Sequence, residues 1–292
     1  MRSAPRLLRE SVFCEAVGRN TAACIGWAAL EIRKRDPDGV MVVLPADHIV
    51  RPVAAFKRSL ETALALADRE RVLVTFGVKP TAPETGYGYI QAHRAAAGAR
   101  NGSLRVEAFH EKPSAPRARR FLRDRNYYWN SGMFAWRADV VLEEIERHAP
   151  QLSAGLQTME RARRGKRIPQ SAVDRVYAVL DSISIDHAVM EKSDRVAMLP
   201  AEFEWSDIGS WDAVASVWPQ DPNGNSSRDP LIALRAKNNL VATRGKPVAL
   251  IGVEGLAVVD SGDAILVWRR DCAQDVRSVV SLLEDSGLGR LK

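Results

Sequence analysis

The 292-residue sequence lacks several features that would place it in a specialised class of protein. No apolar stretch approaches the roughly 20 residues of a membrane span, and Met1 to Glu10 has no apolar core of a secretory signal. The three cysteines have no metal-ligand spacing, and their odd number argues against a disulfide framework. We therefore expect a cytoplasmic protein that has neither a membrane partner nor a cysteine-held metal.

The sequence also lacks a concentrated block of charge of one sign. Its 42 Lys and Arg residues exceed its 36 Asp and Glu residues by a formal +6, spread along the chain in short clusters such as Arg117 to Arg120. Nucleic-acid-binding proteins usually gather basic residues in one stripe beside aromatic residues. We therefore expect no nucleic-acid partner. Solvated helix faces account for most of the arginines, and the excess by itself suits small phosphorylated ligands about as well as RNA.

What is present is the pattern of an ordinary globular protein, with 46% apolar and 27% charged residues. A helix with a cap at Asn20 or Thr21 is followed by an apolar strand at Val40 to Leu44. Pro52 opens a second helix, and a second strand spans Val72 to Val78. This order predicts an α/β fold with right-handed crossovers and a mainly parallel sheet.

The run from Val40 to Leu44 is typical of a strand buried on both faces of such a sheet. Pro45 cannot donate to a ladder and ends this strand, so Asp47 and His48 emerge at its carboxyl end. Ligands of open α/β sheets bind at that edge. Asp47 is therefore placed either to hold a cation or to cap the next element.

Several other polar positions allow two interpretations. The Gly18–Thr21 turn is an anion or base-edge site, or an ordinary helix start. Gly86 and Gly88 permit close approach of a ligand to the backbone, or form a tight hairpin. Glu111 and Lys112 suit a sugar hydroxyl and a phosphate, or form a surface ion pair.

Two further polar residues stand out later in the chain. Asn130 lies in the most aromatic stretch, where its amide must find partners. Asp207 precedes a helix start that Ser210 could cap. The turn-rich segment Asp221–Pro230 then predicts a boundary between a core of residues 1–222 and a β-rich module of residues 223–292 with a closing helix.

Together these stretches resemble one family, the mannose-1-phosphate guanylyltransferases, a branch of the nucleotide-sugar pyrophosphorylases. The resemblance rests on motifs that occur in the family's order: Gly18–Ala22, Leu44–His48, Pro83–Ile90, Glu111–Pro113, Trp129–Phe134, Ser184–Lys192 and Trp205–Trp211. It implies a Rossmann-like nucleotide-diphospho-sugar transferase core followed by the small β-rich module. It is also compatible with a homodimer.

The resemblance implies that mannose 1-phosphate attacks the α-phosphate of GTP, giving GDP-mannose and pyrophosphate. By position in the family motifs, Asp47 and Asp207 are the carboxylates that hold Mg²⁺, and Lys112 is a catalytic residue beside the sugar phosphate. The sugar-binding set is Gly88, Glu111, Lys112 and Asn130. The nucleotide-binding set is Glu15, Gly18, Asn20 and Thr21.

The sequence departs from the family at its start. The family opens with a strand and a glycine-rich loop that cradles the triphosphate, whereas Met1 to Cys14 contains no glycine. We therefore expect an N-terminally incomplete core with impaired transfer. Two alternatives are a non-catalytic sugar-nucleotide binding subunit and a sister enzyme that acts on another sugar 1-phosphate.

Overall fold

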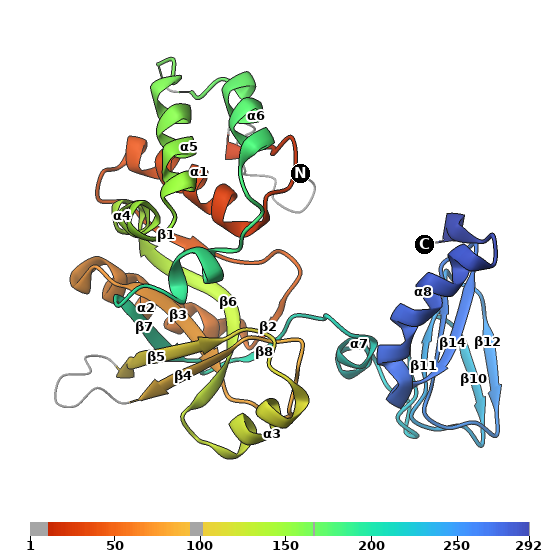
Figure 1. Cartoon of the computed structure of the whole chain (residues 1–292). Helices are drawn as coiled ribbons and strands as arrows, with labels where there is room; N and C mark the ends of the chain where they lie inside the picture. The colour runs from red at the N-terminus through yellow and green to blue at the C-terminus, as the bar shows by residue number, and fades with distance from the viewer. Residues whose placement is uncertain (1–10, 94–101, 166, 292) are drawn as a thin grey trace. The chain divides into compact units, whose positions relative to one another are not determined.

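The computed structural model of the chain describes residues 11–93, 102–165 and 167–291 (Figure 1). Its contacts divide the chain into two units, each of which is described by itself. The first contains Met1–Ala46 and Val50–Trp205, and the second contains Asp47–Ile49 and Ser206–Lys292. The division falls at the short strands β2 (Ile49–Arg51) and β8 (Glu204–Ser206).

The first unit is built on a six-stranded sheet with the order β1-β6-β3-β7-β5-β4. The strands are β1 (Val40–Val43), β3 (Leu73–Val78), β4 (Tyr89–His93), β5 (Leu104–His110), β6 (Tyr127–Arg137) and β7 (Val196–Pro200). The pairings make β1, β3, β7 and β4 run in one direction and β6 and β5 in the other. The predicted α/β core is confirmed. Four of the six strands run in one direction, but most neighbouring pairs are antiparallel because β6 lies between β1 and β3 and β5 lies between β7 and β4.

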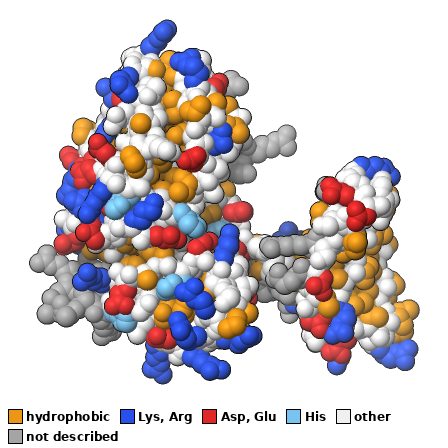
Figure 2. Space-filling model, viewed as in Figure 1, with side chains coloured by type: hydrophobic (Ala, Val, Ile, Leu, Met, Phe, Trp, Pro, Cys, Tyr) orange, Lys and Arg blue, Asp and Glu red, His pale blue; other side chains and the backbone are white. Residues whose placement is uncertain are grey.

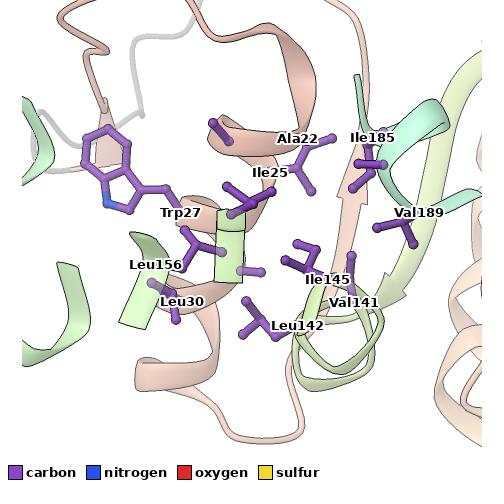
Figure 3. Packing of buried hydrophobic residues seen from close by; sticks show 14 of the residues in the cluster. Ala22, Ile25, Trp27, Leu30, Val141, Leu142, Ile145, Leu156, Ile185 and Val189 are labelled. Atoms are coloured by element: carbon purple, nitrogen blue, oxygen red, sulfur yellow. The ribbon is translucent and has the colours of Figure 1, made fainter. Parts of the chain in front are cut away.

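Helices cover both faces of this sheet. Alternate residues of β6 point to opposite sides and therefore pack with different helices. Phe134 and Trp136 pack with α1 (Asn20–Arg35), α4 (Ala138–His148), α5 (Pro150–Arg161) and α6 (Gln170–Val179). Met133 and Ala135 pack with α2 (Val53–Glu70) on the other face. Figure 3 shows the first cluster, in which side chains of α1 meet those of α4 and also Ile185. The sequence analysis did not identify α6.

The prediction that Val40 to Leu44 is buried on both faces is wrong. Only Met41 of β1 is buried, and Leu44 is 46% exposed. The reason is position: within the described residues β1 pairs with β6 alone and is an edge strand. The strand with continuous burial is β3, which lies between β6 and β7 and is buried from Leu73 to Gly77.

The second unit contains a coil of short strands. The β-rich C-terminal module predicted from the sequence is confirmed, whereas its coiled arrangement was not predicted. Its elements are α7 (Trp211–Val217), β9 (Ser226–Ser227), β10 (Leu231–Leu234), β11 (Leu240–Ala242), β12 (Val248–Ile251), β13 (Leu256–Asp260), β14 (Ile265–Arg269) and α8 (Val276–Asp285). Successive coils stack in parallel, β9 on β11 on β13 and β10 on β12. Buried Asn239 joins them, since its amide donates to Asn225 Oδ1 and its oxygen accepts from Leu256 N. Val276 of α8 packs on Trp268 of this unit. The boundary after residue 222 stays a prediction.

The side chains of the larger unit carry both signs of charge on the face shown in Figure 2. Arg71, Arg137 and Arg195 each form an ion pair with a carboxylate of this unit. Among the described residues, none of the helices combines the length and apolar composition that a bilayer crossing requires.

One ion pair of this unit is shielded enough to affect stability strongly. The guanidinium of Arg163, 6% exposed, lies 3.1 Å from the carboxylate of Glu31 on α1, which is 9% exposed. We expect Arg163→Ala to lower the free energy of unfolding by about 3–5 kcal/mol, because it leaves the Glu31 charge buried and unpaired. Arg147→Ala is the matched control: this exposed partner of Asp194 is expected to matter by less than about 1 kcal/mol. Urea unfolding of both variants measures the difference, and equal losses would contradict the assignment.

Candidate functional site

Strand register brings three of the predicted sugar-binding residues together. Tyr89 on β4 stands opposite both His110 on β5 and Trp129 on β6, and both pairings are antiparallel. The residue before Tyr89 is therefore opposite the residue after His110 and the residue after Trp129. These are Gly88, Glu111 and Asn130. Their separation in sequence is large, and only the folded sheet makes them neighbours.

The contact at Gly88 leaves no space for a side chain. The backbone N–H of Asn130 donates to Gly88 O at 2.8 Å. A Cβ atom at position 88 would lie 2.4 Å from Glu111 Oε2. Glycine at this position therefore allows the Glu111 carboxylate to lie directly over the backbone.

Asn130 finds the partners that its aromatic surroundings demanded. Its amide nitrogen donates to Asp186 Oδ1 at 2.7 Å, and its oxygen accepts from the backbone N–H of Gly132 at 3.2 Å. Asp186 begins a single π-helical turn, η3 (Asp186–Met190). Such turns are frequent at functional sites. Asp186 lies in the Ser184–Lys192 motif but was not predicted as a site residue, although a carboxylate at the start of a short helix was a usable signal.

The pKa values of the two carboxylates of this cluster are both raised. Burial and the neighbouring Asp186 raise the pKa of Glu111, while Lys112 and His187 act in the opposite direction. Burial also raises the pKa of Asp186, and the hydrogen bond from Asn130 lowers it. Lys112 Nζ lies 3.9 Å from Glu111 Oε1 and its side chain is 69% exposed, so the ion pair is loose and the ammonium faces solvent.

The predicted nucleotide-binding residues occupy the start of α1 and the chain before it. Thr21 does not cap α1. Its Oγ1 instead accepts from the backbone N–H of Ile185 at 2.9 Å, and Ala22 N donates to Ile183 O at 3.2 Å. Asn20 adopts a left-handed conformation with φ 61°. The start of α1 is thus tied to the segment that leads into Asp186.

The other two members of that set lie in the chain before α1. Glu15 lies near α6. Burial raises the pKa of Tyr177 on that helix, and the charge of Glu15 raises it further. Gly18 has open space where a Cβ would be. The structure therefore ties Thr21 to the sugar-side cluster through hydrogen bonds of the 183–185 segment, and it places Glu15 beside another helix.

The two predicted metal ligands both belong to the second unit, and both influence the pKa of His48. Burial lowers the pKa of His48, and the charges of Asp47 and Asp207 each raise it. Asp47 is 86% exposed, and Asp207 Oδ1 accepts from Gly209 N at 2.9 Å. Ser210 caps α7 as predicted, accepting from Ala213 N at 3.1 Å.

The donor chemistry of Asp47 and Asp207 fits a hard cation. Within the described residues, no three His, Cys, Asp or Glu side chains gather closely enough to form a metal site by themselves. Mg²⁺ does not need such a cage, because it is usually held by one or two carboxylates together with waters and substrate phosphates. Two carboxylates beside one histidine are therefore compatible with Mg²⁺.

Comparison with known proteins agrees with the motif resemblance. Residues 6–223 match the family model described as nucleotidyl transferase, and residues 229–283 match the MannoseP isomerase/GMP-like beta-helix domain. The xanthan biosynthesis protein XanB of Xanthomonas campestris pv. campestris (strain B100) is 41% identical over 278 residues. That match covers 95% of this chain and 58% of the relative.

Two further relatives carry names that bear on chemistry. A mannose-1-phosphate guanylyltransferase of Escherichia coli is 38% identical over 279 residues, which cover 96% of this chain and 59% of the relative. A solved structure described as a mannose-1-phosphate geranyltransferase from Thermus thermophilus is 35% identical with a TM-score of 0.81. The match covers 93% of this chain and 77% of that one. The chain therefore belongs to the nucleotidyl transferase family and carries, after that domain, a β-helix segment of the MannoseP isomerase/GMP-like type.

Proposed function

We propose that this chain transfers GMP from GTP to mannose 1-phosphate, giving GDP-mannose and pyrophosphate. The observation that carries the proposal is the convergence of Gly88, Glu111 and Asn130, three residues from separate motifs, on one point of the sheet. A backbone without a side chain, a carboxylate and an oriented amide can together accept and donate hydrogen bonds to sugar hydroxyls. The names of the relatives favour mannose as that sugar.

The proposed reaction is an in-line displacement at phosphorus. An oxygen of the sugar phosphate forms a new bond to the α-phosphorus of GTP, and the bond from that phosphorus to the bridging oxygen breaks as pyrophosphate leaves. No general base is needed, because a phosphate monoester is already charged near neutral pH. Both reactants are anions, so catalysis depends on holding them together and on offsetting charge.

Each predicted residue has a role in this scheme. Glu111 accepts hydrogen bonds from sugar hydroxyls, and Lys112, whose ammonium is exposed, attracts the sugar phosphate. Glu15, Gly18, Asn20 and Thr21 contact the guanosine. Mg²⁺ held by Asp47 and Asp207 would offset the charge of the phosphates.

A second candidate, a sugar-nucleotide binding subunit with little turnover, is favoured by one sequence feature. Residues 1–14 contain no glycine, the residue type on which tight phosphate-binding turns depend. The chain also spans only 58–59% of the curated relatives named above. In this alternative the protein binds GDP-mannose well and turns over slowly. A cytoplasmic location remains a prediction.

The test combines binding with turnover. Calorimetry is expected to show binding of GDP-mannose in preference to GDP-glucose and UDP-glucose. Pyrophosphate release with Mg²⁺ is expected from GTP and mannose 1-phosphate, and not from UTP and glucose 1-phosphate. Binding of all three sugar nucleotides with equal affinity would overturn the mannose assignment, and no binding of any of them would overturn the proposed function.

Glycine 88 offers a sharper test of the sugar contacts. In Gly88→Ala the new methyl group would displace the Glu111 carboxylate, which can swing away because it is the end of a flexible side chain. We expect the fold to persist and the affinity for GDP-mannose to fall about 5- to 150-fold, equivalent to about 1–3 kcal/mol for unpaired sugar hydroxyls. Glu111→Ala is expected to have a similar effect. Gly86→Ala is the control, because nothing lies within 4 Å of a Cβ at that position. Equal losses of affinity in Gly88→Ala and Gly86→Ala would contradict the contact between position 88 and Glu111.

A further inference from the structure

We propose that Asp186 is a positioning residue that fixes the amide of Asn130 and, through the residue before it, joins the sugar-binding cluster to the start of α1. This inference rests on the proposed function, because it assigns Asp186 a role in the same site. Asp186 belongs to neither the sugar-binding set nor the nucleotide-binding set predicted from the sequence.

The first step concerns the orientation of the Asn130 amide. Its nitrogen donates to Asp186 Oδ1 at 2.7 Å, while its oxygen accepts from Gly132 N at 3.2 Å and from Thr75 Oγ1 at 3.4 Å. Rotating the amide by half a turn would set its oxygen against the Asp186 carboxylate and its nitrogen against the Gly132 N–H. Both contacts would be repulsive, so Asp186 and Gly132 select a single orientation.

The second step concerns the anchoring of Asp186 itself. Ile185, Ala188, Val189 and Met190 are at most 1% exposed and pack in the cluster formed by α1 and α4. Ile185 and Val189 face that cluster in Figure 3. A buried residue thus precedes Asp186 and three buried residues end η3, so the position of its carboxylate is set by the core.

The third step is the connection to α1. Ile185 N donates to Thr21 Oγ1 at 2.9 Å, and Ala22 N donates to Ile183 O at 3.2 Å. Asp186 follows Ile185 directly, so one peptide unit separates the hydrogen bond to Thr21 from the carboxylate that holds Asn130. A displacement of Thr21 on nucleotide binding would be transmitted to Asn130 through this short, core-anchored segment.

Asp186 also acts on Glu111 through its charge. Glu111 faces the charged and titratable groups of Asp186, Lys112, His187 and Glu191, and of these Asp186 has the largest effect on its pKa, which it raises. Removing the negative charge of Asp186 stabilises the ionised form of Glu111. The pKa of Glu111 therefore falls, and sugar-nucleotide binding that needs ionised Glu111 persists to lower pH.

The experiment compares Asp186→Ala, Asp186→Asn and Asp194→Asn. Asp194 undergoes the same chemical change as Asp186, but its side chain is 73% exposed and bonded to Arg147. Calorimetry with GDP-mannose is run between about pH 4.5 and 8, on unaltered protein and on each variant. We expect about 10- to 100-fold weaker binding for Asp186→Ala at about pH 7.5. Asp186→Asn keeps an acceptor for Asn130, so its affinity for GDP-mannose is expected to lie within about threefold of that of the unaltered protein. The acid limb of its binding profile, where affinity falls as pH falls, is expected to move to lower pH.

Two results would overturn the inference and one would overturn the proposed function instead. Unchanged affinity in Asp186→Ala, or an acid limb in Asp186→Asn that coincides with that of Asp194→Asn, would remove Asp186 from the site. If Asp186→Ala does not fold, the pH profile of Asp186→Asn decides. Failure of the unaltered protein to bind GDP-mannose would overturn the function from which the inference starts.

Discussion

Asp207→Asn and Asp47→Asn are each expected to lower Mg²⁺-dependent pyrophosphate release by on the order of 10³-fold. A metal ion that offsets charge on a transferring phosphoryl group contributes several kcal/mol to transition-state stabilisation, and each ~1.4 kcal/mol corresponds to a factor of ten in rate. Neutralising either carboxylate halves the charge of the proposed ligand pair. Asparagine keeps the shape of the side chain, so the loss reports charge and not packing.

The control for this prediction lies in the same unit. Asp263 is exposed in a turn between β13 and β14 and accepts from Ser261 Oγ at 2.8 Å. Asp263→Asn is expected to leave both turnover and the Mg²⁺ requirement unchanged. Turnover is measured at micromolar enzyme over a Mg²⁺ titration. If a variant of Asp47 or Asp207 keeps the Mg²⁺ dependence of the unaltered protein, that residue is not a metal ligand and has only a local structural role.

The class of fold was predictable from sequence because it depends on local patterns, and ordered motifs pointed to the three residues that meet at Gly88; their role in sugar binding stays a prediction. The alternation of apolar runs with capped helices indicated an α/β core. Gly88, Glu111 and Asn130 each stood out by residue type within a motif. Their convergence depends on two antiparallel registers at Tyr89, which no local pattern contains.

The errors have a different physical origin. An apolar run such as Val40 to Leu44 indicates a strand, but its burial depends on how many strands lie beside it, and β1 pairs with β6 alone in the described sheet. Leu73 to Gly77 is less apolar, since it contains Thr75 and Gly77, yet it is fully buried because β6 and β7 flank it. Thr21 was a plausible cap by residue type, yet its hydroxyl is bonded to Ile185, 164 residues away.

A rise in turnover on joining a glycine-rich phosphate loop before Met1 is the other large effect that we expect. The triphosphate of GTP carries several negative charges that must be bound by backbone N–H groups and cations, because the attacking sugar phosphate is also an anion. Glycine-rich turns can present such N–H groups, and residues 1–14 contain no glycine. Removing one preorganised donor from other enzymes lowers the rate by about 10²–10³-fold, so joining a set of such donors to this chain is expected to raise its rate by at least that much.

The decisive comparison places a glycine-rich phosphate loop ahead of this chain. A chimera in which that segment of a guanylyltransferase relative is joined before Met1 is assayed beside the unaltered chain for pyrophosphate release from GTP and mannose 1-phosphate. We expect the chimera to be faster by about 10²–10³-fold, with similar affinity for mannose 1-phosphate because the cluster at Gly88 is unchanged. A second chimera with the loop glycines changed to alanine controls for chain length. Equal turnover by all three proteins would show that residues outside the loop, such as Lys112 and the Asp47–Asp207 pair, suffice to offset the charge of the triphosphate.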